Sequence, residues 1–224
     1  MTQFDKIICM IPARMGSQRL KQKNMRLING IPLITHAIRK AKQIDIFDEI
    51  WVNSEHNAIK QVALQEGVEF YQRSKELSDN TATSEDFVYD FMKKQNSEYL
   101  VQLHTIAPLL EIDTIKNFTN HLINRKIDAQ FSVVLEQIEC CCEGQPINFS
   151  TEKKTNSQEL KAIQRITWSI TGWRTNNYIQ VYEQGKCATY NGEVNYFPID
   201  RIEGTIIKDE IDLKLANAFG GVKI

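Results

Sequence analysis

Short apolar runs alternate with amphipathic segments along the first 135 residues, and this alternation most restricts how the chain can fold. The run at 6–13 is short and almost wholly apolar, as expected for a strand that is buried on both faces of a sheet. The same pattern predicts further strands at 49–53, 68–71, 99–103 and 128–135, and helices at 32–41, 58–66, 84–92 and 112–123. Because strands separated by helices form a mainly parallel sheet covered on both faces, the sequence predicts the α/β class.

The third predicted helix carries a clear start signal. Ser84 is expected to cap its N-terminus, because a hydroxyl at that position accepts hydrogen bonds from free backbone amides. Glu85 and Asp86 follow in the first turn, where the helix dipole favours acidic side chains. The sequence therefore predicts that this helix begins at about residue 84.

The regular alternation stops at 136–161, a largely polar stretch with little periodicity. Regular structure is expected again as strands at 166–170, 187–190 and 194–198, with helices at 176–183 and after residue 209. A polar stretch of this length is typical of a loop, an arm or a subunit contact. We therefore expect one domain, 1–224, with an arm or interface insertion around 136–183.

Charge and cysteine content exclude several classes of protein. The 27 Lys and Arg residues balance 28 Asp and Glu residues, so no net basic charge favours nucleic acid or an anionic membrane as a partner. The first apolar run is too short to span a membrane and does not resemble a signal peptide. The five cysteines, three of them adjacent at 140–142, form a poor disulfide framework and favour a reducing cytoplasm over a metal site.

The loop that follows the first predicted strand is the most unusual segment. It carries Arg14, Arg19, Lys21 and Lys23 and no acidic residue. Grouped cations repel one another unless solvent or an anion screens them, and Arg and Lys both bind phosphate oxygens. Ligands of open parallel sheets bind at the loops that follow the strands. The loop therefore indicates either a phosphate site or a solvated basic surface.

Two sequence blocks resemble a known family. The block IPARMGSQRLKQKN at 11–24 resembles the P-A-R-x-G-S signature of the cytidylyltransferases that make CMP-activated acidic sugars. This family includes the CMP-sialic acid (acylneuraminate) and CMP-Kdo synthetases. The block RSKELSDNTATS at 73–84 is similar to a second family segment, and VNSE at 52–55 lies between the two. The resemblance implies a three-layer, Rossmann-like nucleotidyltransferase fold with a mainly parallel sheet and a dimerisation-type arm.

The resemblance also implies the reaction and its residues. CTP and a small acidic, sugar-like acceptor would give a CMP-sugar and pyrophosphate, and the enzyme would be a cytoplasmic homodimer. Arg14 and Lys23 would be catalytic through the phosphates. The implied nucleotide site comprises Ala13, Arg14, Met15, Gly16, Ser17, Lys23, Asn24, Arg73, Ser84 and His104. Two alternatives stay open, because Arg73 could pair only with Glu76, and Ser84 could only cap its helix.

The sequence departs from the family pattern in three segments. His104 stands where the sialic acid enzymes have a cytosine-reading Gln, and an imidazole cannot copy the paired donor and acceptor of an amide. Arg174 lies in the altered strand TGWRT at 171–175 and is a candidate for recognising the acceptor's acid group. The family's metal-binding D-I-D-x-x-x-D motif, aligned on Asp212, places Ile206 and Lys208 at its first two acids.

The altered motif leaves three interpretations of the expected Mg²⁺ cofactor. Glu203 or Asp209 could supply the missing ligands, Lys208 could replace the charge of the metal, or the chain could have lost transfer activity. We therefore expect a cytidylyltransferase, and Lys208 is a candidate substrate-binding residue. The alternatives are a nucleotidyltransferase of the same fold with another base or a phosphorylated or phosphonate acceptor, and a catalytically impaired nucleotide-binding protein.

Overall fold

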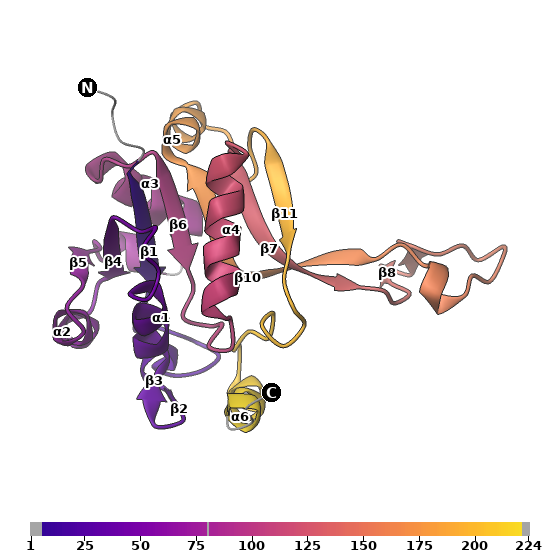
Figure 1. Ribbon diagram of the computed structural model, residues 1–224, viewed down its shortest axis with the longest axis horizontal. Coiled ribbons are helices and arrows are strands. Elements are labelled where there is room, and N and C mark those ends of the chain that lie inside the picture. Colours follow the sequence, from indigo (N-terminus) through magenta and orange to yellow (C-terminus); the bar gives the residue numbers. More distant parts are fainter. Residues whose placement is uncertain (1–5, 80, 221–224) are drawn as a thin grey trace.

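A seven-stranded sheet forms the centre of the computed structural model, which describes residues 6–79 and 81–220 (Figure 1). Its strand order is β11-β7-β10-β6-β1-β4-β5. The strands are β1 (Ile7–Pro12), β4 (Glu49–Ser54), β5 (Glu69–Gln72), β6 (Tyr99–Leu103), β7 (Ala129–Glu136), β10 (Ile163–Arg174) and β11 (Val194–Pro198). All neighbours pair in parallel except β10, which runs antiparallel to both β6 and β7.

Helices cover both faces of this sheet and complete a three-layer α/β fold. One face carries α1 (Leu33–Ala41), α2 (Asn57–Gln65) and α4 (Ile112–Asn124), and the other carries α3 (Ser84–Lys94) and α5 (Thr175–Glu183). A last helix, α6 (Glu210–Gly220), packs beside the short hairpin of β2 (Leu27–Ile28) and β3 (Ile31–Pro32). The predicted α/β class with a mainly parallel sheet is confirmed.

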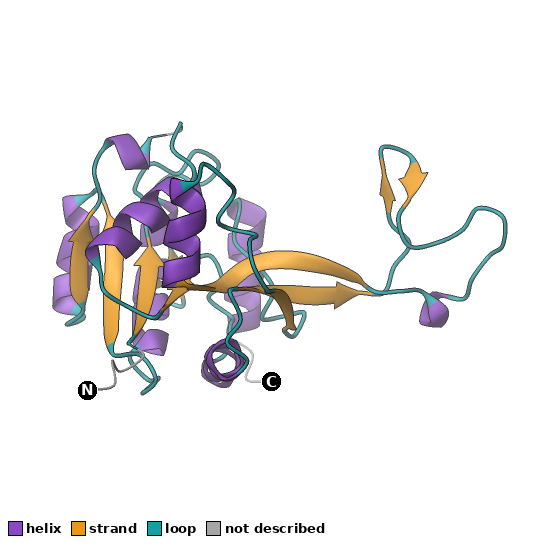
Figure 2. Ribbon diagram, turned by 90° about the horizontal axis from the view of Figure 1, so that it is seen from above, coloured by secondary structure: helices purple, strands orange, loops and turns teal. Residues whose placement is uncertain are grey.

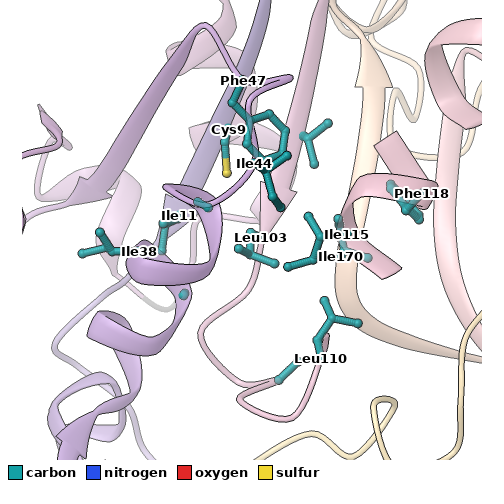
Figure 3. Packing of buried hydrophobic residues seen from close by; sticks show 14 of the residues in the cluster. Cys9, Ile11, Ile38, Ile44, Phe47, Leu103, Leu110, Ile115, Phe118 and Ile170 are labelled. Carbon is teal, nitrogen blue, oxygen red and sulfur yellow. The ribbon is translucent and has the colours of Figure 1, made fainter. Parts of the chain in front are cut away.

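The alternating side chains of each strand divide the core between the two faces. In β1, Cys9 and Ile11 contact the α1 and α4 side, whereas Ile8 and Met10 contact the α3 and α5 side. Phe118 of α4 is fully buried in the first of these clusters (Figure 3). Burial on both faces explains why the predicted strands are apolar throughout instead of alternating with polar residues.

Two local predictions are wrong. Thr83, not Ser84, caps α3: the Asp86 amide donates to Thr83 Oγ1 at 3.4 Å, and the Thr83 amide donates to Asp86 Oδ2 at 2.7 Å. This reciprocal pairing is the capping box, which satisfies two amides at once. The predicted strand at 187–190 is absent, because the Thr189 amide donates to Glu85 Oε1 and its carbonyl accepts from Trp173 Nε1, leaving no strand ladder.

An arm leaves the sheet where β7 and β10 continue as a two-stranded ribbon (Figure 2). The ribbon ends at the pair Glu136 and Ile163, and the chain between them carries β8 (Cys141–Cys142) and β9 (Gln145–Pro146). Within the range 136–183, residues from Thr171 onward pair with β6 or form α5, so they belong to the body. The part that leaves the body is centred on 137–162.

Removal of the Phe118 ring tests the core assignment. We expect Phe118→Ala to lower the free energy of unfolding by about 3–5 kcal/mol, because the lost aromatic contacts leave a cavity under the sheet. Urea denaturation measures this loss. Leu64→Ala on α2 is the control, since Leu64 is 54% exposed and its truncation should change stability by less than about 0.5 kcal/mol. Equal effects of the two substitutions would contradict the assignment.

Candidate nucleotide-binding site

The loops that follow β1 and β6 meet beside α3 and enclose a cavity of about 430 Å³. Both strands end at this edge of the sheet, where ligands of open parallel sheets bind. Four of the lining residues carry a positive charge, and none carries a carboxylate. The lining residues are Pro12, Arg14, Ser17, Gln18, Arg19, Lys23, Asn24, Arg73, Phe87, His104, Thr105 and Ile106.

Arg14, Arg19 and Lys23, which we call the cation cluster, bring the charge of the basic loop to this cavity. Burial lowers the pKa of the Lys23 ammonium, and the nearby guanidinium groups of Arg19 and Arg14 lower it further. Lys23 Nζ donates to the Ile207 carbonyl at 3.4 Å, so the segment before α6 contacts the cluster. Concentrated positive charge beside strand ends suits a polyanionic ligand.

Asn24 fixes the backbone of the basic loop. Its Nδ2 donates to the Arg14 carbonyl at 2.8 Å, and its Oδ1 accepts from Thr105 Oγ1 at 2.5 Å. Asn24 is 5% exposed and lies in the 3₁₀ helix η1 (Lys23–Met25). The side chain predicted to contact nucleotide therefore joins the two loops that line the cavity.

Two of the three backbone amides of 15–17 donate hydrogen bonds to other groups of the protein. Met15 N donates to Glu55 Oε1 at 2.8 Å, and Ser17 N donates to the Met15 carbonyl at 2.9 Å. Ala13 is buried, and its amide donates to the Asn53 carbonyl. A Cβ on Gly16 would meet no atom within 4 Å. Of the residues 13–17, Arg14 and Ser17 line the cavity.

Arg73 enters the cavity as a buried cation held by neutral groups. Its Nε donates to Asn53 Oδ1 at 2.7 Å, its Nη2 donates to the Asn53 carbonyl at 3.0 Å, and its guanidinium lies 3.9 Å from the centre of the Phe87 ring. Burial lowers its pKa to about 10, an effect that the Glu55 carboxylate opposes. The alternative pairing of Arg73 with Glu76 is absent among the described contacts.

His104 lies at the junction of β6 with the cavity. Its backbone amide donates to the Ser169 carbonyl at 3.1 Å, and its Nε2 is buried without a hydrogen-bond partner in the described part of the chain. Burial, with a contribution from Lys23, lowers its pKa from the ordinary 6.5 to about 4. The imidazole is therefore neutral at pH 7 and presents one polar nitrogen that a ligand could satisfy.

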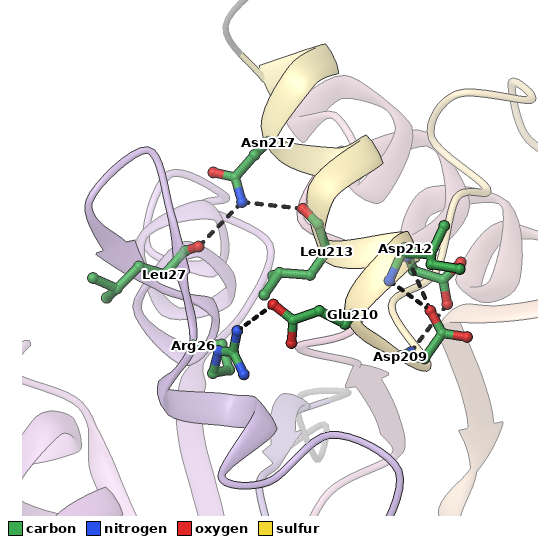
Figure 4. A network of polar contacts seen from close by, with 8 residues as sticks. Arg26, Leu27, Asp209, Glu210, Asp212, Leu213 and Asn217 are labelled. Carbon is green, nitrogen blue, oxygen red and sulfur yellow. Dashed lines mark hydrogen bonds and ion pairs between the residues drawn. The ribbon is translucent and has the colours of Figure 1, made fainter.

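The acidic residues before and within α6 are committed to backbone hydrogen bonds (Figure 4). Asp209 Oδ1 accepts from the amides of Ile211 and Asp212, and Asp212 Oδ2 accepts from the amides of Lys208 and Asp209. Glu210 pairs with Arg26 at 2.7 Å, which ties the helix to the basic loop. Asp209 and Asp212 thus cap the start of α6, and Glu210 is the carboxylate that joins this helix to the N-terminal part of the chain.

The positions considered for Mg²⁺ do not form a ligand set. Glu203 is 7% exposed, its carboxylate accepts from the amides of Glu111 and Asp200, and its charge acts on Lys40. Ile206 packs against the core, and Lys208 is exposed beside Ile207. In residues 6–79 and 81–220 no group of three His, Cys, Asp or Glu side chains could hold a metal ion. The residues present do not fit a protein-bound Mg²⁺.

The structure does not bring Ser84 or Arg174 into the cavity lining. Ser84 is exposed at the start of α3, one turn before Phe87. Arg174 pairs with Tyr99 at the amino end of β6 and donates to Glu98 at 2.9 Å, whereas the cavity lies beyond the carboxyl end of β6. Arg174 is therefore at the opposite edge of the sheet.

Sequence reasoning missed the residues that position the charged groups. Phe87 lies within the predicted helix at 84–92, and its ring covers the Arg73 guanidinium. Asn53 and Glu55 lie at the end of β4 and hold Arg73 and Met15. A polar pair directly after an apolar strand was the one available signal, because strand ends meet at this edge.

The fold and the cation-lined cavity have the features of an α/β nucleotide-binding protein. A family model described as cytidylyltransferase matches residues 8–199. The chain therefore belongs to the cytidylyltransferase family, as the two sequence blocks predicted. Among the described residues, no helix is long and apolar enough to cross a membrane.

The chain is similar in sequence to cytidylyltransferases of other organisms. The chain is 32% identical over 168 residues to a pseudaminic acid cytidylyltransferase of Campylobacter jejuni, covering 69% of this chain and 72% of that protein. It is 33% identical over 126 residues to an N-acylneuraminate cytidylyltransferase of Streptococcus agalactiae, covering 55% of this chain. That match spans only 30% of the length of the Streptococcus protein.

Solved structures share the fold at low sequence identity. A CMP:2-keto-3-deoxy-manno-octonic acid synthetase complexed with CTP matches with a TM-score of 0.75 at 17% identity, covering 98% of this chain and all of that one. The 4-diphosphocytidyl-2C-methyl-D-erythritol synthase of Anaerococcus prevotii matches with a TM-score of 0.72 at 13% identity, covering 97% of each chain. These matches support the nucleotidyltransferase fold.

The lowered pKa of His104 predicts a pH-dependent stability. Between pH 6.5 and about 4 the unfolded chain binds a proton at His104 that the folded chain does not, so the contribution of His104 to stability falls as the pH falls through this range. We expect wild-type protein to lose more stability on acidification than His104→Gln, measured by urea unfolding at a series of pH values. Parallel curves for the two proteins would contradict the assignment.

Proposed function

We propose that this protein transfers CMP from CTP to an acidic sugar of the nonulosonic or Kdo-like class and releases pyrophosphate. The observation that carries the proposal is the cation cluster at the strand ends of a cytidylyltransferase-family chain. The name of the Campylobacter relative supports a nonulosonic acid such as pseudaminic acid as the acceptor.

The cation cluster supports a mechanism based on charge neutralisation and alignment. A hydroxyl oxygen of the acceptor attacks the α-phosphorus of CTP, and a new P–O bond forms. The bond from the α-phosphorus to the bridging oxygen of the β-phosphate breaks, pyrophosphate leaves with the electron pair, and the hydroxyl proton passes to solvent. Arg14 and Lys23 bind the phosphates and stabilise the charge that develops on them.

The remaining lining residues suit the nucleoside. Arg73 keeps a fixed orientation under Phe87, and in this proposal its guanidinium faces the base or ribose. His104 provides a single neutral nitrogen for the same pocket. Asn24 acts by holding the loop. Lys208 follows Ile207, whose carbonyl accepts from Lys23, and in this proposal Lys208 contacts the acceptor or pyrophosphate.

Loss of one cluster charge tests the assignment to the reaction. Lys23→Gln is expected to lower kcat/KM by about 10²–10³-fold, a loss of about 3–4 kcal/mol of transition-state stabilisation. The exposed Lys186→Gln is the matched control and should leave kcat/KM unchanged. The assay is mass spectrometry of the CMP-sugar formed from CTP and pseudaminic, sialic or Kdo-type acids.

Thermal shift with all four nucleoside triphosphates separates the alternatives. Stabilisation by CTP together with product formation supports the proposal. Stabilisation by another nucleotide favours a same-fold nucleotidyltransferase with a different base, which the His104 departure would explain. Stabilisation by CTP without product from any acidic sugar favours an impaired nucleotide-binding protein or a phosphorylated or phosphonate acceptor, and it contradicts the proposed reaction.

We also propose that the protein is a cytoplasmic homodimer joined through the arm. Leu135, Ile138 and Ile147 are 50%, 54% and 56% exposed on the ribbon and its tip, which supports contact with a second copy. The five free cysteines support a reducing compartment. Sedimentation velocity of the full chain is expected to give a dimer mass, and a monomer at micromolar concentration would contradict the arm assignment.

A further inference from the structure

All charged side chains that line the nucleotide cavity are positive. Arg14, Arg19, Lys23 and Arg73 contribute positive charge, and no Asp or Glu side chain is among the residues that line the cavity. Neither Arg19 nor Lys23 forms an ion pair with another residue of the described ranges 6–79 and 81–220. Arg19 and Lys23 are therefore not held in ion pairs by carboxylates of these ranges.

The carboxylates of Glu55, Asp209 and Asp212 already accept backbone hydrogen bonds. Glu55 accepts from the Met15 amide, which fixes the basic loop. Asp209 and Asp212 each accept from two amides at the start of α6. The oxygens that hold these amides are Glu55 Oε1, Asp209 Oδ1 and Asp212 Oδ2, and offering Asp209 Oδ1 or Asp212 Oδ2 to a metal would leave amides without acceptors at the start of α6.

Asp212 is the acidic residue whose charge reaches Lys23, and its Oδ2 is occupied by two backbone amides. Its charge raises the pKa of Lys23 against the opposing effects of burial, Arg19 and Arg14. At nucleotide sites magnesium is usually held by one or two carboxylates together with waters and substrate phosphates, and ammonium or guanidinium groups nearby repel it. The side chains at the site have the charge that a metal would otherwise supply.

We propose that this chain provides no carboxylate ligand for a divalent cation at the nucleotide site, and that Arg14, Arg19 and Lys23 neutralise the triphosphate instead. The inference rests on the proposed function and specifies its ligand as uncomplexed nucleoside triphosphate. Arg19 becomes a phosphate-binding residue in this proposal. It lines the cavity, and its side chain is exposed. Uncomplexed nucleoside triphosphate carries more negative charge than its magnesium complex. It therefore binds at least as tightly as that complex, because the site itself is cationic.

Calorimetric titration tests this on the full chain, with CTP and with inorganic tripolyphosphate as probes. We expect both to bind in EDTA, and we expect excess Mg²⁺ to leave the affinity for CTP unchanged or to weaken it. Titration of Mn²⁺, followed through the electron paramagnetic resonance signal of the free ion, gives a second readout. The protein–CTP complex should bind Mn²⁺ within about 2-fold of the affinity of CTP alone.

Arg19→Gln tests the role of the cation cluster without disturbing the fold, because the side chain is exposed. We expect this variant to bind CTP about 10-fold more weakly in EDTA, with part of the loss restored by Mg²⁺. Arg125→Gln, an equally exposed charge at the end of α4, is the matched control and should leave the affinity unchanged.

The outcomes separate this inference from the proposed function. Binding of CTP only with Mg²⁺, or a Mn²⁺ affinity of the complex at least about 10-fold above that of CTP alone, overturns the inference and leaves the transfer reaction standing. Tripolyphosphate binding in EDTA without CTP binding supports the inference and contradicts the choice of CTP. Absence of binding by either probe in EDTA overturns the inference.

Discussion

The hydrogen bonds of Asn24 join the two loops on which the candidate site depends. One side-chain amide binds the Arg14 carbonyl after β1 and accepts from Thr105 after β6, so both loops keep a fixed distance across the cavity. Without this link, a loop of mutually repelling cations would gain freedom by extending into solvent. The buried Asn24 therefore sets the geometry in which Arg14 and Lys23 act.

Much of the fold could be predicted because local patterns and packing agree. Apolar runs such as 99–103 coincide with β6, and Gly67, at a φ of 69°, follows the end of α2. The direction of β10 could not be predicted in this way, because hydrophobic periodicity does not specify which neighbour a strand pairs with or its orientation. The direction of β10 determines where Arg174 lies. Because β10 is antiparallel to β6, its last residue lies at the edge of the sheet opposite the cavity.

The sequence predicts the site residues that belong to a concentrated group of charges. It does not predict the roles of residues that depend on their hydrogen-bond partners. Arg14 and Lys23 stand out in the sequence, and both line the cavity. Asp209 and Glu203 were equally reasonable candidates for metal binding until their backbone partners were known. Backbone amides at helix ends and in loops can occupy the carboxylate oxygens that a metal would need. The sequence alone does not show which partner each carboxylate binds.

The central claim is that the cation cluster binds the triphosphate of the nucleotide. A crystal structure of the protein grown with CTP in the presence of EDTA tests it most directly. The account predicts phosphate oxygens within hydrogen-bond distance of Arg14, Arg19 and Lys23, with the base toward Arg73 and His104. A triphosphate bound elsewhere, for example in the hollow beside Lys40 and α6, would contradict it.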